Sequence, residues 1–163
     1  MSYWVYKVNS RRFVGSKGWH FDRYFRARQN HPYPMGGRDW IRSPRSWACL
    51  KRVRANDLFL CYQSDERKIY GLARAARSGY ESLPGSGVFD SVDFHPGGLR
   101  LVGPVPVAHP TTMTVFRNIA AFTVPSRGTI HPIRAEDFRA ILAVLKQFNP
   151  GQKDAIAQFT KRN

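Results

Sequence analysis

Short apolar runs alternate with polar turns along this chain, and the apolar runs have the length and composition of β-strands. The run YWVYKV at residues 3–8 is aromatic and β-branched and contains no turn former, which is typical of a strand. Residues 56–64, NDLFLCYQS, place an Asn-Asp turn before a nearly continuous apolar run, so we predict a strand buried on both faces. A charged tip at 65–68 and the segment 69–77 complete a hairpin, in which Gly71 permits a bulge or close packing.

The second half of the chain predicts further strands and one well-defined helix. Residues 88–94 alternate apolar and polar side chains, as a half-buried strand does. Residues 97–107 form a strand candidate whose prolines confine one end to an edge or a crossover. A short helix is expected over 110–122, and a short strand near Gly128. Residues 135–148 carry apolar side chains at the i, i+3, i+4 and i+7 spacing of an amphipathic helix.

Residues 11–37 interrupt this pattern with polar, basic and aromatic sequence. A short helix is predicted within 20–28, and the Pro/Gly-rich stretch 30–37 is predicted to be a loop. We interpret the segment as a basic, aromatic insertion in a single domain that spans residues 1–163, a length that suits one compact core. The mixture of strands and helices predicts an α/β or α+β fold.

Charge changes the picture, because the protein is strongly basic. The formal net charge is +15, from 26 Lys and Arg against 11 Asp and Glu. Residues 1–54 hold 13 basic and two acidic residues, so the excess is concentrated at the N-terminus. A high charge can serve solubility alone. In WHFDRYFRAR at 19–28, however, arginines alternate with aromatics, and both side chains stack on nucleic-acid bases. We therefore expect a nucleic-acid partner.

The sequence lacks the residue patterns that several classes of chemistry require. Cys49 and Cys61 have no metal-ligand spacing and are expected to be buried thiols of a reducing compartment. The histidines form no i, i+4 pair, and no phosphate-binding glycine motif or nucleophile-base arrangement is present. The sequence therefore predicts no metal, no cofactor and no enzymatic activity. No apolar run approaches the length of a membrane span, so the expected location is the cytoplasm, without membrane contact.

The order of the motifs resembles that of the EVE domain family of the PUA-like superfamily, and more distantly that of YTH domains. The motifs are YWVYKVN, then WIRSPRSWACL, KRVRANDLFLCYQS and KIYGLARAARSGY, and the likeness extends over residues 3–80. The segment RGTIHPIRAEDFRAIL at 127–142 resembles the family's ending. Three features depart from the family: Asn56 stands where the turn usually has glycine, residues 41–45 differ from the usual sequence after the tryptophan, and the long basic insertion at 11–37 is unlike the short helix expected there.

The resemblance implies a PUA-like twisted β-barrel or sheet flanked by helices. It also implies a non-enzymatic reader that accommodates a flipped, modified base in an aromatic pocket, most simply methylated or hydroxymethylated cytosine in DNA. An RNA-binding module that recognises N6-methyladenine, or RNA shape without a cytosine modification, is the alternative. DNA with a modified base is thus the expected partner, with an effector nuclease on another chain as a further one.

Candidate site residues follow from the matched motifs. Trp40 is expected to form a pocket wall, although a core position is its alternative. Asn9 is a base-edge candidate or a turn former, and Ser43 is a base contact or the N-cap of a helix that starts at Pro44. Trp47 and Leu50 of that helix are assigned to the core. Tyr62 and Gln63 point to opposite faces of a strand, so at most one faces the pocket, and Gln63 is preferred. The predicted base pocket is Asn9, Trp40, Ser43, Gln63, Tyr62 and Phe94, and the predicted phosphate contacts are Lys7, Arg42, Arg45 and Arg127.

Overall fold

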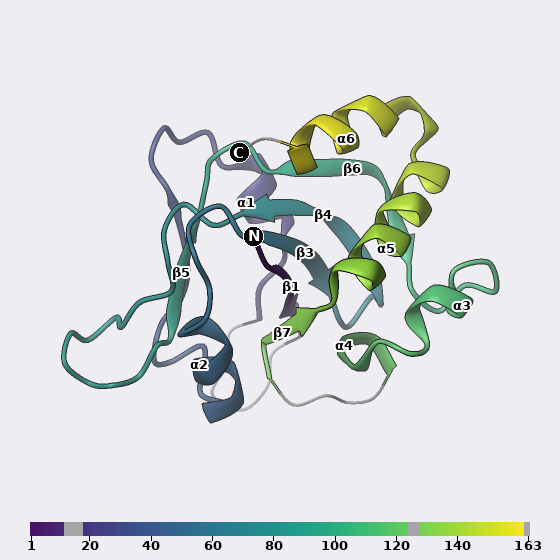
Figure 1. Cartoon of the computed structure of the whole chain (residues 1–163). Coiled ribbons are helices and arrows are strands. Elements are labelled where there is room, and N and C mark those ends of the chain that lie inside the picture. The colour runs from purple at the N-terminus through teal and green to yellow at the C-terminus, as the bar shows by residue number, and fades with distance from the viewer. Residues whose placement is uncertain (12–17, 124–127, 162–163) are drawn as a thin grey trace.

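An open, five-stranded mixed sheet occupies the centre of the protein (Figure 1). The computed structural model describes residues 1–11, 18–123 and 128–161. The strand order is β6-β4-β3-β1-β7, and a second, two-stranded sheet pairs β2 with β5. Of the pairings in the larger sheet, only that of β1 with β3 is parallel among the described strands. The strands are β1 (Tyr3–Val8), β2 (Tyr33–Gly36), β3 (Leu58–Gln63), β4 (Lys68–Arg74), β5 (Ser91–Phe94), β6 (Leu99–Pro106) and β7 (Ile130–Ile133).

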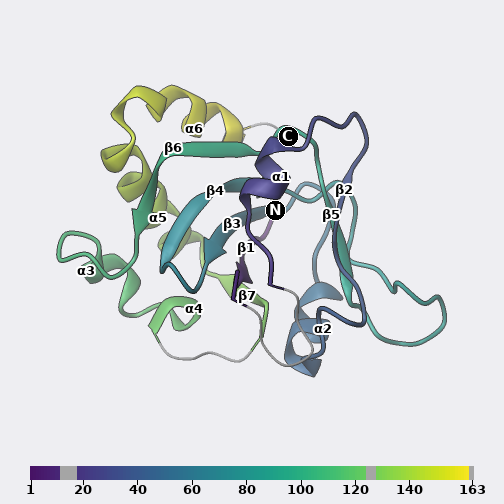
Figure 2. The same cartoon turned by 180° about the vertical axis from the view of Figure 1, so that it is seen from behind.

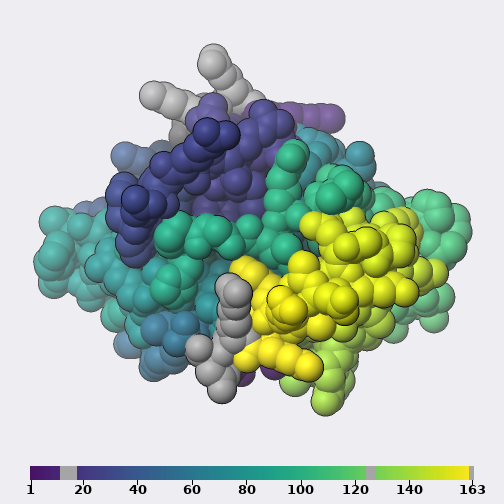
Figure 3. Space-filling view, turned by 90° about the horizontal axis from the view of Figure 1, so that it is seen from above, coloured from purple at the N-terminus to yellow at the C-terminus, as the bar shows by residue number. Residues whose placement is uncertain are grey.

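Helices and the small sheet cover the two faces of the large sheet (Figures 1 and 2). The C-terminal helices α3 to α6 lie over one face, and α1, α2 and the β2-β5 sheet lie over the other. From above, the end of the chain that contains α5 and α6 (yellow-green to yellow) covers one side of the molecule, next to segments from the middle of the chain (Figure 3). The helices are α1 (Asp22–Arg26), α2 (Pro44–Leu50), α3 (Met113–Phe116), α4 (Ala120–Thr123), α5 (Ala135–Phe148), the 3₁₀ turn Pro150–Gln152 and α6 (Lys153–Lys161).

Strand β3 shows why two cores form. All six of its residues are buried, as the continuous apolar run predicts. Alternation sends Leu58, Leu60 and Tyr62 to the core under the C-terminal helices. Phe59 and Cys61 point to the core under α1, α2 and the small sheet. The same alternation is the reason why Tyr62 and Gln63 are predicted to point to opposite faces of the sheet.

Most predicted elements are present, and their special residues explain local details. The bulge expected at Gly71 is a shift of register between β4 and β6. Strand β6, which contains the prolines, has β4 as its one neighbour among the described strands and lies at the edge of the sheet. Asn56, which replaces a glycine of the related turn, has a φ of 71°, a left-handed conformation that asparagine tolerates better than most residues.

Three predictions need correction. The stretch 30–37 is not all loop, because residues 33–36 form β2, with Met35 fully buried. Pro34 is tolerated there because β2 pairs with one strand, β5, within the described ranges. Strand β5 is buried at all four positions rather than at alternate ones, and 110–122 forms two single-turn helices instead of one. The insertion thus contributes to the core through the buried side chains of Phe21, Tyr24 and Met35.

Candidate nucleic-acid interface

A pocket of about 810 Å³ opens where the two parallel strands end. Val8 and Asn9 follow from β1, and Ser64 comes directly after β3. The carboxyl ends of parallel strands commonly form ligand sites, because the chain leaves the sheet there and the connecting segments surround a crevice. Here the surrounding segments come from the stretch before α1, from the turn before α2 and from the residues before β7.

Two tryptophans form the aromatic part of the pocket. Trp19 and Trp40 are both half-buried, and their ring centroids lie 5.4 Å apart at an interplanar angle of 55°. At this separation the two rings contact each other, so they make one continuous aromatic wall rather than a slot between parallel planes. A planar ligand would stack on the open part of this wall.

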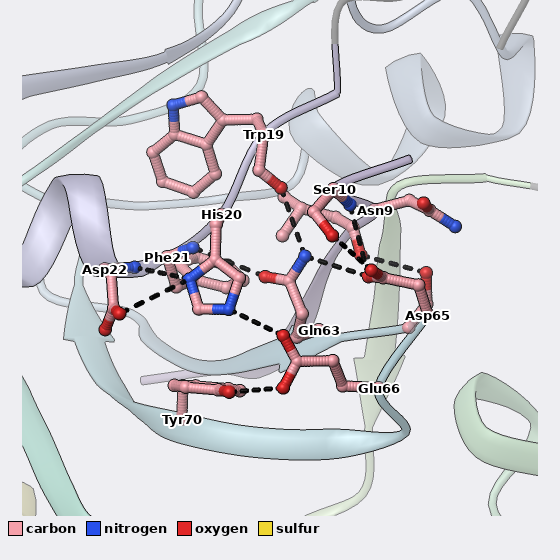
Figure 4. Close-up of polar contacts among 12 residues, drawn as sticks. Asn9, Ser10, Trp19, His20, Phe21, Asp22, Gln63, Asp65, Glu66 and Tyr70 are labelled. Atoms are coloured by element: carbon pink, nitrogen blue, oxygen red, sulfur yellow. Dashed lines mark hydrogen bonds and ion pairs between the residues drawn. The ribbon is translucent and has the colours of Figure 1, made fainter. Parts of the chain in front are cut away.

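Gln63 holds the Trp19 segment against the end of β3 (Figure 4). Its side-chain amide donates from Nε2 to the carbonyl of Trp19 at 3.1 Å and accepts at Oε1 from the N–H of Phe21 at 3.3 Å. The same Nε2 donates to Asp65 Oδ1 at 2.9 Å. Because Gln63 is fully buried, these bonds form away from water, where leaving such groups unpaired is costly. The backbone N–H of Trp19 also donates to the carbonyl of Asn9 at 2.8 Å.

The turn between β3 and β4 supplies a second set of polar contacts to this segment (Figure 4). The His20 Nε2 atom lies 2.9 Å from Glu66 Oε1, and Glu66 also accepts a hydrogen bond from the Tyr70 hydroxyl. Asp65 accepts from the backbone N–H and the hydroxyl of Ser10. The hydrogen bonds from Ser10 and Gln63 hold the pKa of Asp65 below its ordinary value, against the effect of burial. The turn between β3 and β4 therefore holds in place, through Ser10 and His20, the two chain segments that flank the pocket.

Trp40 is positioned by the tight turn before α2. The backbone N–H groups of Trp40 and Ile41 both donate to the carbonyl of Gly37, at 3.0 and 2.8 Å. Ile41 is fully buried, and the Trp40 ring packs edge-on against Tyr6, with centroids 6.3 Å apart. Trp47 lies outside the pocket lining, packs on the core and donates from Nε1 to the Ile41 carbonyl at 2.7 Å. Both tryptophans of this motif pack against the same core, and Trp40 alone of the two also lines the pocket.

Hydrogen bonds beside the pocket join α2 and β1 to the residues just before β7. Ser46, which is fully buried, accepts a hydrogen bond at Oγ from the N–H of Thr129 at 2.8 Å. The Lys7 N–H donates to the Thr129 carbonyl at 2.7 Å. His131 Nε2 lies 3.0 Å from the carbonyl of Gly128. Burial and, to a lesser degree, the positive charges of Lys7 and Arg45 lower the pKa of His131, although the hydrogen bond to Gly128 opposes them.

Charged side chains complete the pocket. Lys7, Arg23 and Arg42 line it, and burial lowers the pKa of Lys7. The Arg42 Nε atom donates to the backbone carbonyl of Asp39 at 3.1 Å. Asp39 lines the same pocket, so three cations and one carboxylate surround it within the described part of the chain. Cations at the mouth of an aromatic pocket suit a ligand with an aromatic ring and a phosphate.

The structure brings together only some of the predicted site residues. Asn9, Trp40, Lys7 and Arg42 line the pocket. The others do not. Gln63 is buried behind the Trp19 segment, Ser43 is the N-cap residue of α2 without a side-chain cap bond, and Arg45 is exposed on α2. Tyr62 packs against Phe122 on the other face of the sheet, Phe94 is fully buried among core aromatics, and Arg127 lies outside the described residues.

Trp19, Arg23 and Asp39 line the pocket but are absent from the predicted site. The alternation of aromatic and basic residues in 19–28 is the signal that could have identified the first two. Asp39 carried a weaker signal, as one of two acidic residues among the first 54. Among the described residues no group of three His, Cys, Asp or Glu side chains is placed to hold a metal ion. Within the same ranges no helix has the length and apolar character needed to cross a membrane.

Comparison with known proteins gives matches among solved structures. No protein-family model matches the sequence, and no curated protein matches it. The DUF55 domain of human thymocyte nuclear protein 1 superposes with a TM-score of 0.70 at 18% identity, covering 89% of this chain and 99% of that one. Human THYN1 protein in complex with 5-methylcytosine-containing DNA gives a TM-score of 0.67 at 17% identity, covering 90% and 98%. Rpa0253 from Rhodopseudomonas palustris gives 0.64 at 22% identity, covering 91% and 93%.

At these identities the likeness establishes the fold. The predicted PUA-like arrangement, a twisted sheet flanked by helices, is confirmed, and the sheet is open rather than a closed barrel. The neighbours share the fold that the motif resemblance implies.

Proposed function

We propose that this chain is a non-enzymatic nucleic-acid reader that inserts one extruded base, a methylated or hydroxymethylated cytosine of DNA, into the pocket beside Trp40. The observation that carries the proposal is the wall formed by Trp19 and Trp40, flanked by the cations Lys7, Arg23 and Arg42. A protein of the same fold forms a complex with 5-methylcytosine-containing DNA, which supports the choice of ligand.

The physical steps follow from the charge and the shape of the site. The N-terminal excess of positive charge attracts the polyanion and releases its counterions. Base flipping exposes a flat face, which stacks on the open part of the tryptophan wall, and a 5-methyl group adds roughly 0.8 kcal/mol of apolar burial. Asn9 lies after the end of β1 and lines the pocket; its Oδ1 accepts from the N–H of Arg11 at 2.8 Å, and its Nδ2 can donate to a base edge. The contact of the indoles with each other means that the base stacks on the wall and is not held between two planes.

The test measures binding to duplexes that differ in one base, at fixed salt. We expect the wild type to prefer 5-methylcytosine over cytosine, and Trp40→Ala to abolish this preference while overall DNA binding persists through the cations. Phe148→Ala, whose partly buried ring packs on the other core and lies outside the pocket lining, is the matched control and should keep the preference. Urea unfolding of both variants checks that each is folded.

Arginine variants separate charge from base recognition. Arg42→Ala should weaken binding to modified and plain duplexes equally and reduce the salt slope by about one. Arg139, exposed on α5 and remote from the pocket, provides the control Arg139→Ala. Equal affinity of the wild type for modified and unmodified DNA would contradict the proposal. Tighter binding of the matched RNA, or of N6-methyladenine RNA, would favour the RNA-binding alternative.

A further inference from the structure

Asp39 is an unusual residue for a surface that binds a polyanion. It is the one acidic side chain among the described residues that line the pocket, in a protein with 26 basic and 11 acidic residues. A carboxylate at this place repels phosphate and weakens capture of the backbone. Capture of the phosphate backbone therefore does not explain why a carboxylate stands here, and a different role has to be sought for it.

The carboxylate of Asp39 has no partner within the described ranges. The hydrogen bond that Asp39 makes is to its backbone carbonyl, which accepts from Arg42. Most acidic side chains of the protein are engaged, as Asp57 is with the indole N–H of Trp4 at 2.9 Å. Glu81 and Asp154 likewise have no side-chain partner among the described residues, but neither lines the pocket. Asp39 thus combines an unengaged acceptor with a position next to the tryptophan wall.

We infer that Asp39 selects the inserted base by accepting a hydrogen bond from its exocyclic amino group. This inference rests on the proposed function, since it concerns the edge of the base that stacks on Trp40. An ionised carboxylate only accepts hydrogen bonds. It pairs with the N4 amino group of cytosine and repels the O4 oxygen that thymine and uracil carry at the same place. Asp39 therefore excludes thymine, which has the same 5-methyl group as 5-methylcytosine.

Thymine and 5-methylcytosine form a matched pair of ligands. Both rings carry the same methyl group and stack on the same wall, so the aromatic and apolar contacts cancel in their comparison. They differ at the polar edge, where 5-methylcytosine has an amino donor and thymine has a carbonyl acceptor. A pocket that recognises only the methyl group would bind both equally, whereas the carboxylate of Asp39 separates them.

The experiment uses the full chain and short duplexes in which the central residue is 5-methylcytosine, thymine or an abasic sugar. Each central residue stands opposite an abasic site, so that no base pair has to be broken before flipping. We expect the wild type to bind the 5-methylcytosine duplex about tenfold more tightly than the thymine duplex, which is the size of effect of one charge-assisted hydrogen bond. In Asp39→Asn, whose amide can also donate to a carbonyl, this ratio should fall to within about twofold.

Asp154→Asn is the matched control, because it removes one exposed negative charge on α6, which covers the other face of the sheet and lies outside the pocket lining. Both variants should bind all three duplexes somewhat more tightly through the added net charge, but only Asp39→Asn should change the ratio. The role of Asp39 is overturned if Asp39→Asn keeps the wild-type ratio of affinities for the 5-methylcytosine and thymine duplexes. It is also overturned if the wild type binds these two duplexes with equal affinity. If the wild type still prefers either base over the abasic sugar, the pocket proposal survives that result. If all three duplexes bind equally, the pocket proposal fails together with this one.

Discussion

Replacement of Gln63 tests whether a buried amide holds the tryptophan wall in place. The variant Gln63→Leu keeps the size of the side chain but removes its polar atoms. It deletes the hydrogen bonds to the Trp19 carbonyl, the Phe21 N–H and the Asp65 carboxylate, at 3.1, 3.3 and 2.9 Å. Each such bond contributes about 1 kcal/mol net, and a buried group left without its partner adds to the loss. The apolar leucine recovers roughly 1 kcal/mol by burial.

The expected result is a loss of about 2 kcal/mol in the free energy of unfolding. Urea titration followed by tryptophan fluorescence measures it, and hydrogen exchange at the Phe21 amide should show faster local opening. The control is Gln147→Leu, since Gln147 is exposed on α5 and its replacement should change stability by less than about 0.5 kcal/mol. A Gln63→Leu protein as stable as the wild type, with unchanged exchange at Phe21, would refute the assigned role.

Two further predictions concern stability. Gly71→Ala should destabilise the protein by more than about 2 kcal/mol in thermal or urea unfolding, because its Cβ would lie 2.2 Å from the carbonyl oxygen of Leu99. Gly151→Ala, which meets open space, should be near neutral, and equal effects would contradict this reasoning. His131 has a lowered pKa in the folded protein, so the unfolded chain binds the extra proton first and stability should fall as the pH drops below about 6.5. His131→Gln should flatten this part of the stability–pH profile measured in urea, and an unchanged profile would contradict the assignment.

Local patterns in the sequence predicted the central strands well, because these elements satisfy local and tertiary demands together. The continuous apolar run of β3 indicated burial on both faces, and it is buried at every position. The i, i+3, i+4 pattern of 135–148 coincides with α5. Strand β2 was missed because its proline and glycine favour a loop locally. Pairing with β5 and burial of Met35 outweigh that preference.

The site was predicted less completely than the fold. The motif resemblance identified Trp40 and Asn9, which line the pocket, and the alternation along β3 separated Tyr62 from Gln63. Sequence position could not show that Gln63 faces inward and binds the Trp19 segment, since that depends on a segment 44 residues away. Phe94 was expected at the pocket as an aromatic on a later strand, but the small sheet folds it into the core.

The sequence by itself determined the apolar periodicity, the basic N-terminal third and the turn chemistry, since each depends on neighbouring residues. Only the tertiary structure decided which side chains meet. The parallel pairing of β1 with β3 brings the ends of two strands together, and packing of 18–26 and 37–42 over those ends adds Trp19 and Asp39 to the pocket. These contacts join residues far apart in the chain, and they form because burial of the two apolar faces of one sheet fixes where its polar ends lie.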